Sequence, residues 1–345
     1  MSNEKKKNNL TLGKIKHGLL GNLLKDFTSE LDDKRVIMGS KLGEDAAVID
    51  MGDKYLVAKT DPITFVTDEI GYYAVNINVN DIACTGARPK WFQSTILLPE
   101  KGTNEVLIRK IFKNIHDTCK SMNISIIGGH TEVTAGLDRP IVVGSLLGEV
   151  EKDSLISTSG AKPGDALILT KGIFIEGTSI IDREKEQYLI GKGYNTEFVE
   201  KCKNYLYDPG ISVLKDALLA SENFEINSMH DPTEGGLLTG VAEMTLASDT
   251  GIVLFKEEIN ILPEPLELSK VFQLNPLNTI SSGALLIALG KKNAQDLIDL
   301  LKKNGIMAFE IGQFEPKSKG LIMKDKNGHK QNMIYSETDE ITKIF

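Results

Sequence analysis

The sequence predicts an α/β or α+β protein made of two domains of similar size, and three observations support this. The chain has 345 residues, more than one typical domain needs. Strand-like and helix-like segments are mixed along its whole length. A run of turn-forming residues, Ser157 to Asp165, separates two apolar segments. We therefore expect an N-terminal domain over residues 1–156 and a C-terminal domain over residues 157–345.

In the N-terminal half, apolar runs and helical periodicity define the expected elements. Strands are expected within 53–61, 91–98, 125–128 and 140–147. One helix is expected over 69–86, and a longer one after Thr103, which can serve as its N-cap. The longer helix has an apolar stripe at spacings of three and four residues, made of Leu107, Ile111, Ile115, Cys119 and Met122. This stripe predicts a half-buried helix in which Cys119 is a core residue rather than a reactive thiol.

The C-terminal half follows the same alternation. Strands are expected at 166–170, 251–255 and 284–289, and helices at 196–206, 211–222, 235–248 and 293–304. The dipeptide Asn327-Gly328 between two short runs predicts a hairpin. These elements are enough for a second α/β domain.

Composition excludes several classes of protein. With 40 basic and 48 acidic side chains, the net charge of −8 leaves no basic surplus for binding nucleic acid. No apolar run is long enough to span a membrane, and the start of the chain lacks a signal core. The three cysteines form no C-x-x-C pair. We therefore expect a cytoplasmic protein. The net negative charge still allows a phosphorylated small ligand, because a metal ion held by carboxylates can supply the local positive charge.

Several familiar catalytic motifs are missing from the sequence. It has no G-x-x-x-x-G-K-[ST], no G-x-G-x-x-G after a strand, no H-E-x-x-H and no G-x-S-x-G. What remains is a series of five turns rich in acidic residues and glycine. Each turn has a plain structural interpretation, and five in one chain favour a functional one.

The first two turns place carboxylates at the ends of strands. In Gly43-Glu44-Asp45-Ala46-Ala47, an acidic pair precedes an apolar strand, where a carboxylate can hold a hard cation. An acidic surface turn is the alternative. In Lys59-Thr60-Asp61, the lysine and the aspartate point to the same side of a strand. They form either a structural ion pair or part of a site.

The third turn contains polar residues inside an otherwise apolar helix. Asn80 and Asp81 fall where the helix should be buried, and burial without partners would cost a few kcal/mol. They either cap a neighbouring turn or bind a metal or nucleotide.

The last two turns combine glycine with polar residues. Gly128-Gly129-His130-Thr131 follows an apolar run, and paired glycines at a strand exit allow a phosphate to approach the backbone. In Asp231-Pro232-Thr233-Glu234-Gly235-Gly236, the chain enters a helix. Asp231 or Thr233 can cap this helix, and its free N–H groups can form an anion pocket.

In this order, the turns resemble those of the AIR synthase-related superfamily, from about Leu12 to Glu315. This superfamily includes AIR synthase, thiamine-monophosphate kinase, selenophosphate synthetase and the HypE-type hydrogenase maturation factor. The resemblance rests on Gly43 to Ala47, Asn80 to Ala83 with Gly86, Ala87 and Pro89, Gly128 to Thr131, and Asp231 to Gly236. It implies two α/β domains, a homodimer that pairs its N-terminal sheets, and ATP with Mg²⁺ used to phosphorylate or dehydrate a small acceptor.

The resemblance also implies roles for individual residues. Asp45, Asp61 and Asp81 would bind magnesium, and Lys59 would contact the ATP phosphates. Lys59, Asp81 and His130 are the catalytic candidates, and Asn80 is a further nucleotide contact. The expected phosphate turn consists of Gly128, Gly129 and Thr131. The residues expected to face the acceptor are Asp231, Thr233, Gly235 and Gly236.

Two features depart from the HypE-type pattern, which the chain otherwise resembles most. His130 stands where many relatives have an aspartate, and neutral imidazole is a poor magnesium ligand. The chain ends Lys343-Ile344-Phe345 rather than in the cysteine that carries the HypE substrate group. The alternatives are therefore a non-catalytic, nucleotide-binding dimeric scaffold with a maturation-factor partner in hydrogenase assembly, or an enzyme similar to thiamine-monophosphate kinase.

Overall fold

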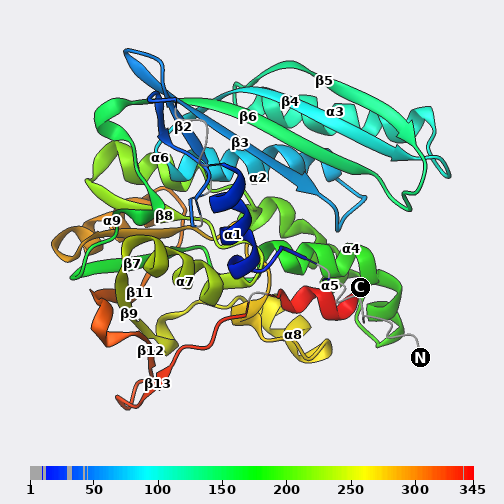
Figure 1. The fold of residues 1–345 in the computed structure, drawn as a ribbon. Helices are drawn as coiled ribbons and strands as arrows, with labels where there is room; N and C mark the ends of the chain where they lie inside the picture. The colour runs from blue at the N-terminus through cyan, green and yellow to red at the C-terminus, as the bar shows by residue number, and fades with distance from the viewer. Residues whose placement is uncertain (1–9, 11–12, 29–32, 42, 45, 337) are drawn as a thin grey trace, which may run out of the picture.

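The chain forms two α/β domains, one above the other in Figure 1, each built on one mixed β-sheet. In this computed structural model the described residues are 10, 13–28, 33–41, 43–44, 46–336 and 338–345. None of the helices in these ranges is both long and apolar enough to cross a membrane.

The N-terminal domain contains a six-stranded sheet in the order β1-β2-β3-β6-β4-β5. Its strands are β1 Val36–Met38, β2 Ala47–Asp50, β3 Lys54–Ile63, β4 Arg88–Pro99, β5 Ser125–Thr134 and β6 Ile141–Glu151. Its helices are α1 His17–Phe27, α2 Ile70–Cys84 and α3 Glu105–Ser121. Helices α2 and α3 pack against each other and against one face of the sheet, whereas α1 lies near the C-terminal domain (Figure 1). Strand β5 lies at the edge of the sheet, and β4 is its only partner among the described strands.

Two glycines on β6 let α2 lie unusually close to the sheet. A Cβ atom at Gly144 would lie 2.3 Å from Nδ2 of Asn78, and one at Gly148 would lie 2.6 Å from Cγ2 of Ile82. Larger residues at these positions would push the helix away. Because β6 is next to β3 in the sheet, this close packing also brings the polar residues of α2 near strand β3.

The C-terminal domain contains a seven-stranded sheet in the order β13-β12-β9-β11-β7-β10-β8. Its strands are β7 Asp165–Thr170, β8 Ile226–His230, β9 Thr250–Phe255, β10 Leu286–Gly290, β11 Ala308–Pro316, β12 Leu321–Lys324 and β13 Lys330–Asn332. Its helices are α4 Ile175–Gly191, α5 Thr196–Asn204, α6 Leu214–Asn223, α7 Gly236–Ser248, α8 Pro263–Val271 and α9 Ala294–Lys303. The strands β12 and β13 form the hairpin that Asn327-Gly328 predicts.

Strand β7 shows why this domain has helices on both faces of its sheet. Ala166 and Ile168 belong to one core, which α6 and α9 complete, while Leu167 and Leu169 point into the other, which includes α4 and α7. A strand covered on both sides reads as a continuous apolar run. This accounts for the uninterrupted Ala-Leu-Ile-Leu sequence.

Most of the expected helices and strands are present. The sequence patterns assigned one helix cap to the wrong residue and missed several elements. Thr103 is not the N-cap of α3, because Asn104 occupies that position and its Oδ1 accepts the Leu107 N–H at 3.0 Å. Thr103 instead bonds the carbonyl oxygen of Pro99. Sequence patterns also missed α1, α4, α8, β1, β8 and β11. Helix α4 lacks the usual start signal, because Phe174 occupies its N-cap position in a left-handed conformation and no side chain caps the helix.

The expected domain boundary, between residues 156 and 157, remains a prediction. It lies between two short 3₁₀ segments, Lys152–Ser154 and Thr158–Gly160. The two domains contact each other beyond this connection, because the buried Ala83 and Cys84 of α2 pack into the core of the C-terminal domain.

Candidate functional site

Lys59 on β3 connects two acidic side chains. Its Nζ lies 3.2 Å from Oδ2 of Asp61 on the same strand and 3.0 Å from Oδ2 of Asp81 on α2. The lysine and Asp81 are largely buried, and Asp61 is half-buried. The structure therefore brings together three of the residues singled out in the sequence, in an environment where charge is screened less than at the surface.

The polar residues of α2 position this group. The Oδ1 of Asn78 accepts the backbone N–H of Asp61 at 3.0 Å, which ties the end of β3 to the helix. Asn80 reaches the other domain: its Nδ2 donates to the Ile211 carbonyl at 2.8 Å, and its Oδ1 accepts the Val213 N–H at 2.9 Å. The C-terminal domain thus uses both polar atoms of the Asn80 amide, and the expected nucleotide contact of Asn80 stays a prediction.

The donor set is suitable for magnesium, although only part of the expected set can be placed. Asp61 and Asp81 supply carboxylate oxygens, the ligand type that Mg²⁺ prefers. Asp45, the third expected ligand, lies outside the described residues, while its neighbour Glu44 accepts the Thr158 N–H at 3.2 Å. Among the described residues, no three His, Cys, Asp or Glu side chains form a group that could hold a metal ion.

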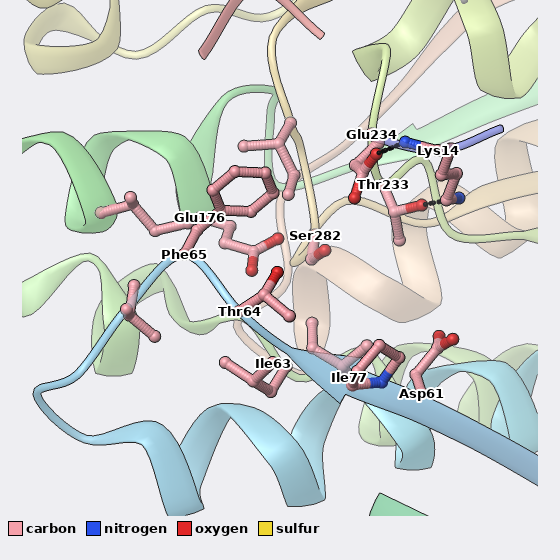
Figure 2. Close-up of a pocket in the computed structure, with 14 residues that line it drawn as sticks. Lys14, Asp61, Ile63, Thr64, Phe65, Ile77, Glu176, Thr233, Glu234 and Ser282 are labelled. Carbon is pink, nitrogen blue, oxygen red and sulfur yellow. Dashed lines mark hydrogen bonds between the residues drawn. The ribbon is translucent and has the colours of Figure 1, made fainter. Parts of the chain in front are cut away.

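A cavity of about 180 Å³ opens beside Asp61, between the two domains (Figure 2). The N-terminal domain contributes Asp61 and the segment that follows it, and the C-terminal domain contributes Glu176 of α4, Ser282 and Thr233. Much of the wall is apolar and consists of Ile63, Phe65, Val66, Ile77, Ile180 and Ile280. An apolar cavity with a few polar groups is the usual form of a small-molecule site.

The segment before α1 covers one side of this cavity. The Lys14 N–H donates to Oε2 of Glu234 at 3.1 Å, and Nζ of Lys14 donates to Oγ1 of Thr233 at 3.1 Å (Figure 2). Thr233, expected to face the acceptor, therefore lies in the wall of the cavity. Lys14 and Glu234 join it there. No sequence pattern singled out Lys14, whereas Glu234 belongs to the expected turn from Asp231 to Gly236 but was given no role of its own.

The start of α7 differs from the expected anion pocket. Neither Asp231 nor Thr233 caps the helix, because Gly235 occupies the N-cap position and donates its N–H to Oδ2 of Asp339 at 2.6 Å. A carboxylate from the end of the chain thus fills the expected anion position. Gly235 and Gly236 are buried with positive φ angles of 82° and 65°, so they shape the turn. Neither glycine, nor the buried Asp231, lines the cavity.

The sequence Gly128-Gly129-His130-Thr131 is not a turn. It lies within β5, which continues to Thr134 and pairs in parallel with β4. A Cβ atom on Gly129 would lie 2.2 Å from the Ser94 carbonyl oxygen, so glycine there serves the pairing of the strands. His130 is exposed and its Nε2 lies 3.0 Å from Oε2 of Glu132.

Within one chain, His130 is far from the Lys59 group. Strands β6 and β4 separate β5 from β3 in the sheet, a span of roughly 14 Å at about 4.8 Å per strand. Gly128, Gly129, His130 and Thr131 line a different cavity of about 540 Å³ between β5 and α3. The structure therefore divides the expected site into two groups, one at β3 and α2 and the other at the edge strand β5 and α3.

The cysteines contribute no reactive thiol. Cys84, Cys119 and Cys202 are all buried. Burial raises the pKa of Cys119 to about 12 and also raises the pKa of Cys202, which disfavours the reactive thiolate. Cys119 is a core residue, as its position in the apolar stripe predicts.

Comparison with known proteins identifies the family. Residues 43–150 match the N-terminal domain of AIR synthase related proteins, and residues 162–324 match their C-terminal domain. The chain belongs to the AIR synthase-related family. Its two-domain α/β architecture is the fold expected from the sequence motifs.

Individual relatives place the chain near hydrogenase maturation proteins. A Methanocaldococcus jannaschii protein named for hydrogenase expression and formation is 30% identical over 322 residues, covering 89% of this chain and 92% of that protein. The selenide, water dikinase of the same organism is 27% identical, with coverage of 86% and 87%. The expected similarity to the HypE branch of this family is confirmed.

Solved structures share the fold. A chain of a HypE–HypF complex matches with a TM-score of 0.73 at 20% identity, covering 92% of this chain and 100% of that one. A thiamine-monophosphate kinase solved with AMPPCP and TMP matches with a TM-score of 0.71 at 18% identity, with coverage of 92% and 95%. A HypE solved in complex with ATP gives 0.67 at 20% identity, with coverage of 93% and 95%.

Proposed function

We propose that this protein uses Mg-ATP to phosphorylate a small acceptor molecule, or to drive its dehydration, at the junction of its two domains. The observation that carries the proposal is Lys59, whose Nζ lies within 3.2 Å of both Asp81 and Asp61, and Asp61 lines the interdomain cavity. An ammonium group between carboxylates can contact phosphate oxygens while the carboxylates hold magnesium. The ATP and AMPPCP complexes of structurally similar proteins support nucleotide binding.

The arrangement fits the requirements of phosphoryl transfer. The bond from Pγ to the bridging oxygen breaks, ADP leaves with the electron pair, and Pγ forms a bond to an acceptor oxygen. If the acceptor is a hydroxyl group, its proton passes to water. Bound magnesium would neutralise charge on the phosphate oxygens. Asp61 belongs to both the ion-pair group and the cavity, so an acceptor in the cavity would lie next to the transferred phosphate.

The homodimer is part of this proposal. The edge strand β5 is exposed along most of its length and includes Ile126, Ile127 and Val133 with relative exposures of 47, 53 and 54%. An exposed apolar edge strand is a ready surface for pairing with another chain. Pairing there would cover Gly128 to Thr131 with a second copy.

Release of ADP tests the function. The purified chain is incubated with Mg-ATP alone and then with thiamine phosphate, carbamoyl phosphate and simple amides, and ADP is measured with a coupled assay. ADP release that rises with one acceptor supports an enzyme. Calorimetric binding of Mg-ATP without turnover on any acceptor would support the scaffold instead. That alternative is favoured by the HypE–HypF complex, in which a structurally similar protein binds a partner.

A further inference from the structure

We infer that the interdomain cavity binds its ligand through Glu176 and Ser282, and that this ligand is a small, largely apolar molecule with a cationic nitrogen group, an amidinium or an ammonium. This ligand would be the acceptor of the proposed reaction, and only that identification rests on the proposed function. Figure 2 shows Glu176 and Ser282 among the polar groups of the cavity wall.

Glu176 and Ser282 present buried oxygen atoms that make no hydrogen bond of regular geometry, although the two side chains are close enough for Ser282 to lower the pKa of Glu176. Glu176 is 4% exposed and Ser282 is 0% exposed, yet neither Oε2 of Glu176 nor Oγ of Ser282 has a hydrogen-bond partner among the described residues. The backbone holds the two side by side, since the Glu176 N–H donates to the Ser282 carbonyl at 3.2 Å. A buried carboxyl oxygen without a partner is costly, and a ligand that donates N–H groups would satisfy it.

Nearby charges select a cation among such donors. Burial is the largest cause of the raised pKa of Glu176. The Ser282 hydroxyl lowers this pKa, and the carboxyl groups of Asp339, Glu234 and Asp231 raise it further. Together they bring this pKa to about 8. Lys14, the only basic residue among the described residues that line the cavity, donates its Nζ to Oγ1 of Thr233. A cationic group would let Glu176 ionise and would offset the negative field.

The rest of the cavity wall restricts the polarity and the size of the ligand. Six apolar side chains, including Phe65, Ile180 and Ile280, surround the space beside Glu176. The volume of about 180 Å³ suits a molecule of about ten non-hydrogen atoms. A strongly anionic ligand is disfavoured at this end of the cavity, whereas Asp61 and Lys59 lie toward the proposed phosphate side.

Fragment binding to the full chain without nucleotide tests this inference. Benzamidine, benzamide and benzoate have nearly the same shape but carry a cationic, a neutral and an anionic group. We expect their dissociation constants, measured by ligand-observed NMR titration, to rank benzamidine tighter than benzamide by at least about tenfold, with benzoate weakest. Equal or tighter binding of benzoate, or no saturable binding of benzamidine, would overturn the inference.

Variants assign the binding to the named residues. Glu176→Gln should weaken benzamidine at least about tenfold and change benzamide less than about threefold, while Ser282→Ala should weaken both about fivefold. Asp182→Asn is the matched control. Asp182 is a fully buried carboxyl on the same helix whose oxygens also lack hydrogen-bond partners in the described structure, but it does not line the cavity. Unchanged benzamidine affinity in both Glu176→Gln and Ser282→Ala would refute the inference.

The test is independent of turnover. If benzamidine binding depends on Glu176 but the protein releases no ADP with any acceptor, the inferred ligand site is supported and the proposed function is contradicted. ADP release that is stimulated by an acceptor but unaffected by Glu176→Gln would do the reverse.

Discussion

The Nζ atom of Lys59 lies 3.0 Å from Oδ2 of Asp81, so a strand residue and a helix residue form a largely buried ion pair. If this pair belongs to the ATP site, Asp81→Asn should reduce ADP release roughly 100-fold. It should also reduce the thermal stabilisation that Mg-ATP confers, because one expected metal ligand is lost. Both effects can be measured by a coupled assay and by differential scanning fluorimetry.

The control for Asp81→Asn is Asp50→Asn. Asp50 on β2 pairs with Lys152 at 2.7 Å on the surface and does not line the interdomain cavity. This variant should keep both ADP release and the response to Mg-ATP. Full stabilisation of Asp81→Asn by Mg-ATP would show that the metal assignment is wrong.

Asn80 should be important for stability rather than for nucleotide binding. Asn80→Ala removes two buried hydrogen bonds between the domains and leaves the backbone groups of Ile211 and Val213 unpaired. We expect a loss of about 3 kcal/mol in the free energy of unfolding, measured by urea titration, with Mg-ATP affinity nearly unchanged. Asn76→Ala is the comparison, because Asn76 is equally buried on α2 but, among the described residues, its amide group donates only to the Tyr72 carbonyl of the same helix. An equal loss in both variants would argue against the interdomain role.

The sequence predicted those parts of the site that lie along one strand or one helix. Lys59 and Asp61 alternate on β3, and Asp81 is a buried acid on an apolar helix, so each stands out locally. Their meeting depends on the close packing of α2 on β6 at Gly144, a contact between segments far apart in the chain. The family resemblance supplied that link where spacing alone could not.

The cavity residues Glu176 and Ser282 were missed for a different reason. Helix α4 begins without a capping side chain, and its first turn carries buried polar residues that obscure the helical pattern. Ser282 lies in a segment between elements, where periodicity gives no information. Conversely, the paired glycines at 128 and 129 resemble a turn in sequence, but Gly129 allows close pairing with the neighbouring strand. The close approach of the Ser94 backbone, which requires a glycine there, cannot be seen in the sequence.

Strand β5 should carry the dimer contact. Ile127→Lys places a charge at the centre of the exposed edge, where pairing with a second chain would bury it at high cost. We expect this variant to be monomeric in light scattering coupled to gel filtration, while the wild type is a dimer.

A lysine at the opposite edge of the sheet is the control for Ile127→Lys. Ile37 on β1 is similarly exposed, at 47%, so Ile37→Lys should leave the dimer intact. A monomeric wild type, or a dimer that survives Ile127→Lys and is lost in Ile37→Lys, would contradict pairing through β5.

The buried carboxyl of Asp182 should make stability depend on pH. Burial raises its pKa from 3.8 to about 7, so the folded state holds this proton more tightly than the unfolded state. The contribution to stability is therefore full below the unfolded value and is lost as pH rises through about 7. Asp182→Asn removes this titration and should narrow the difference in Tm between about pH 5 and about pH 8 by about 2–4 °C. Asp50→Asn, at a half-buried carboxylate whose pKa the Lys152 partner lowers, should leave that difference as in the wild type. A Tm profile of Asp182→Asn that parallels the wild type over this range would mean that Asp182 does not hold its proton in the folded protein.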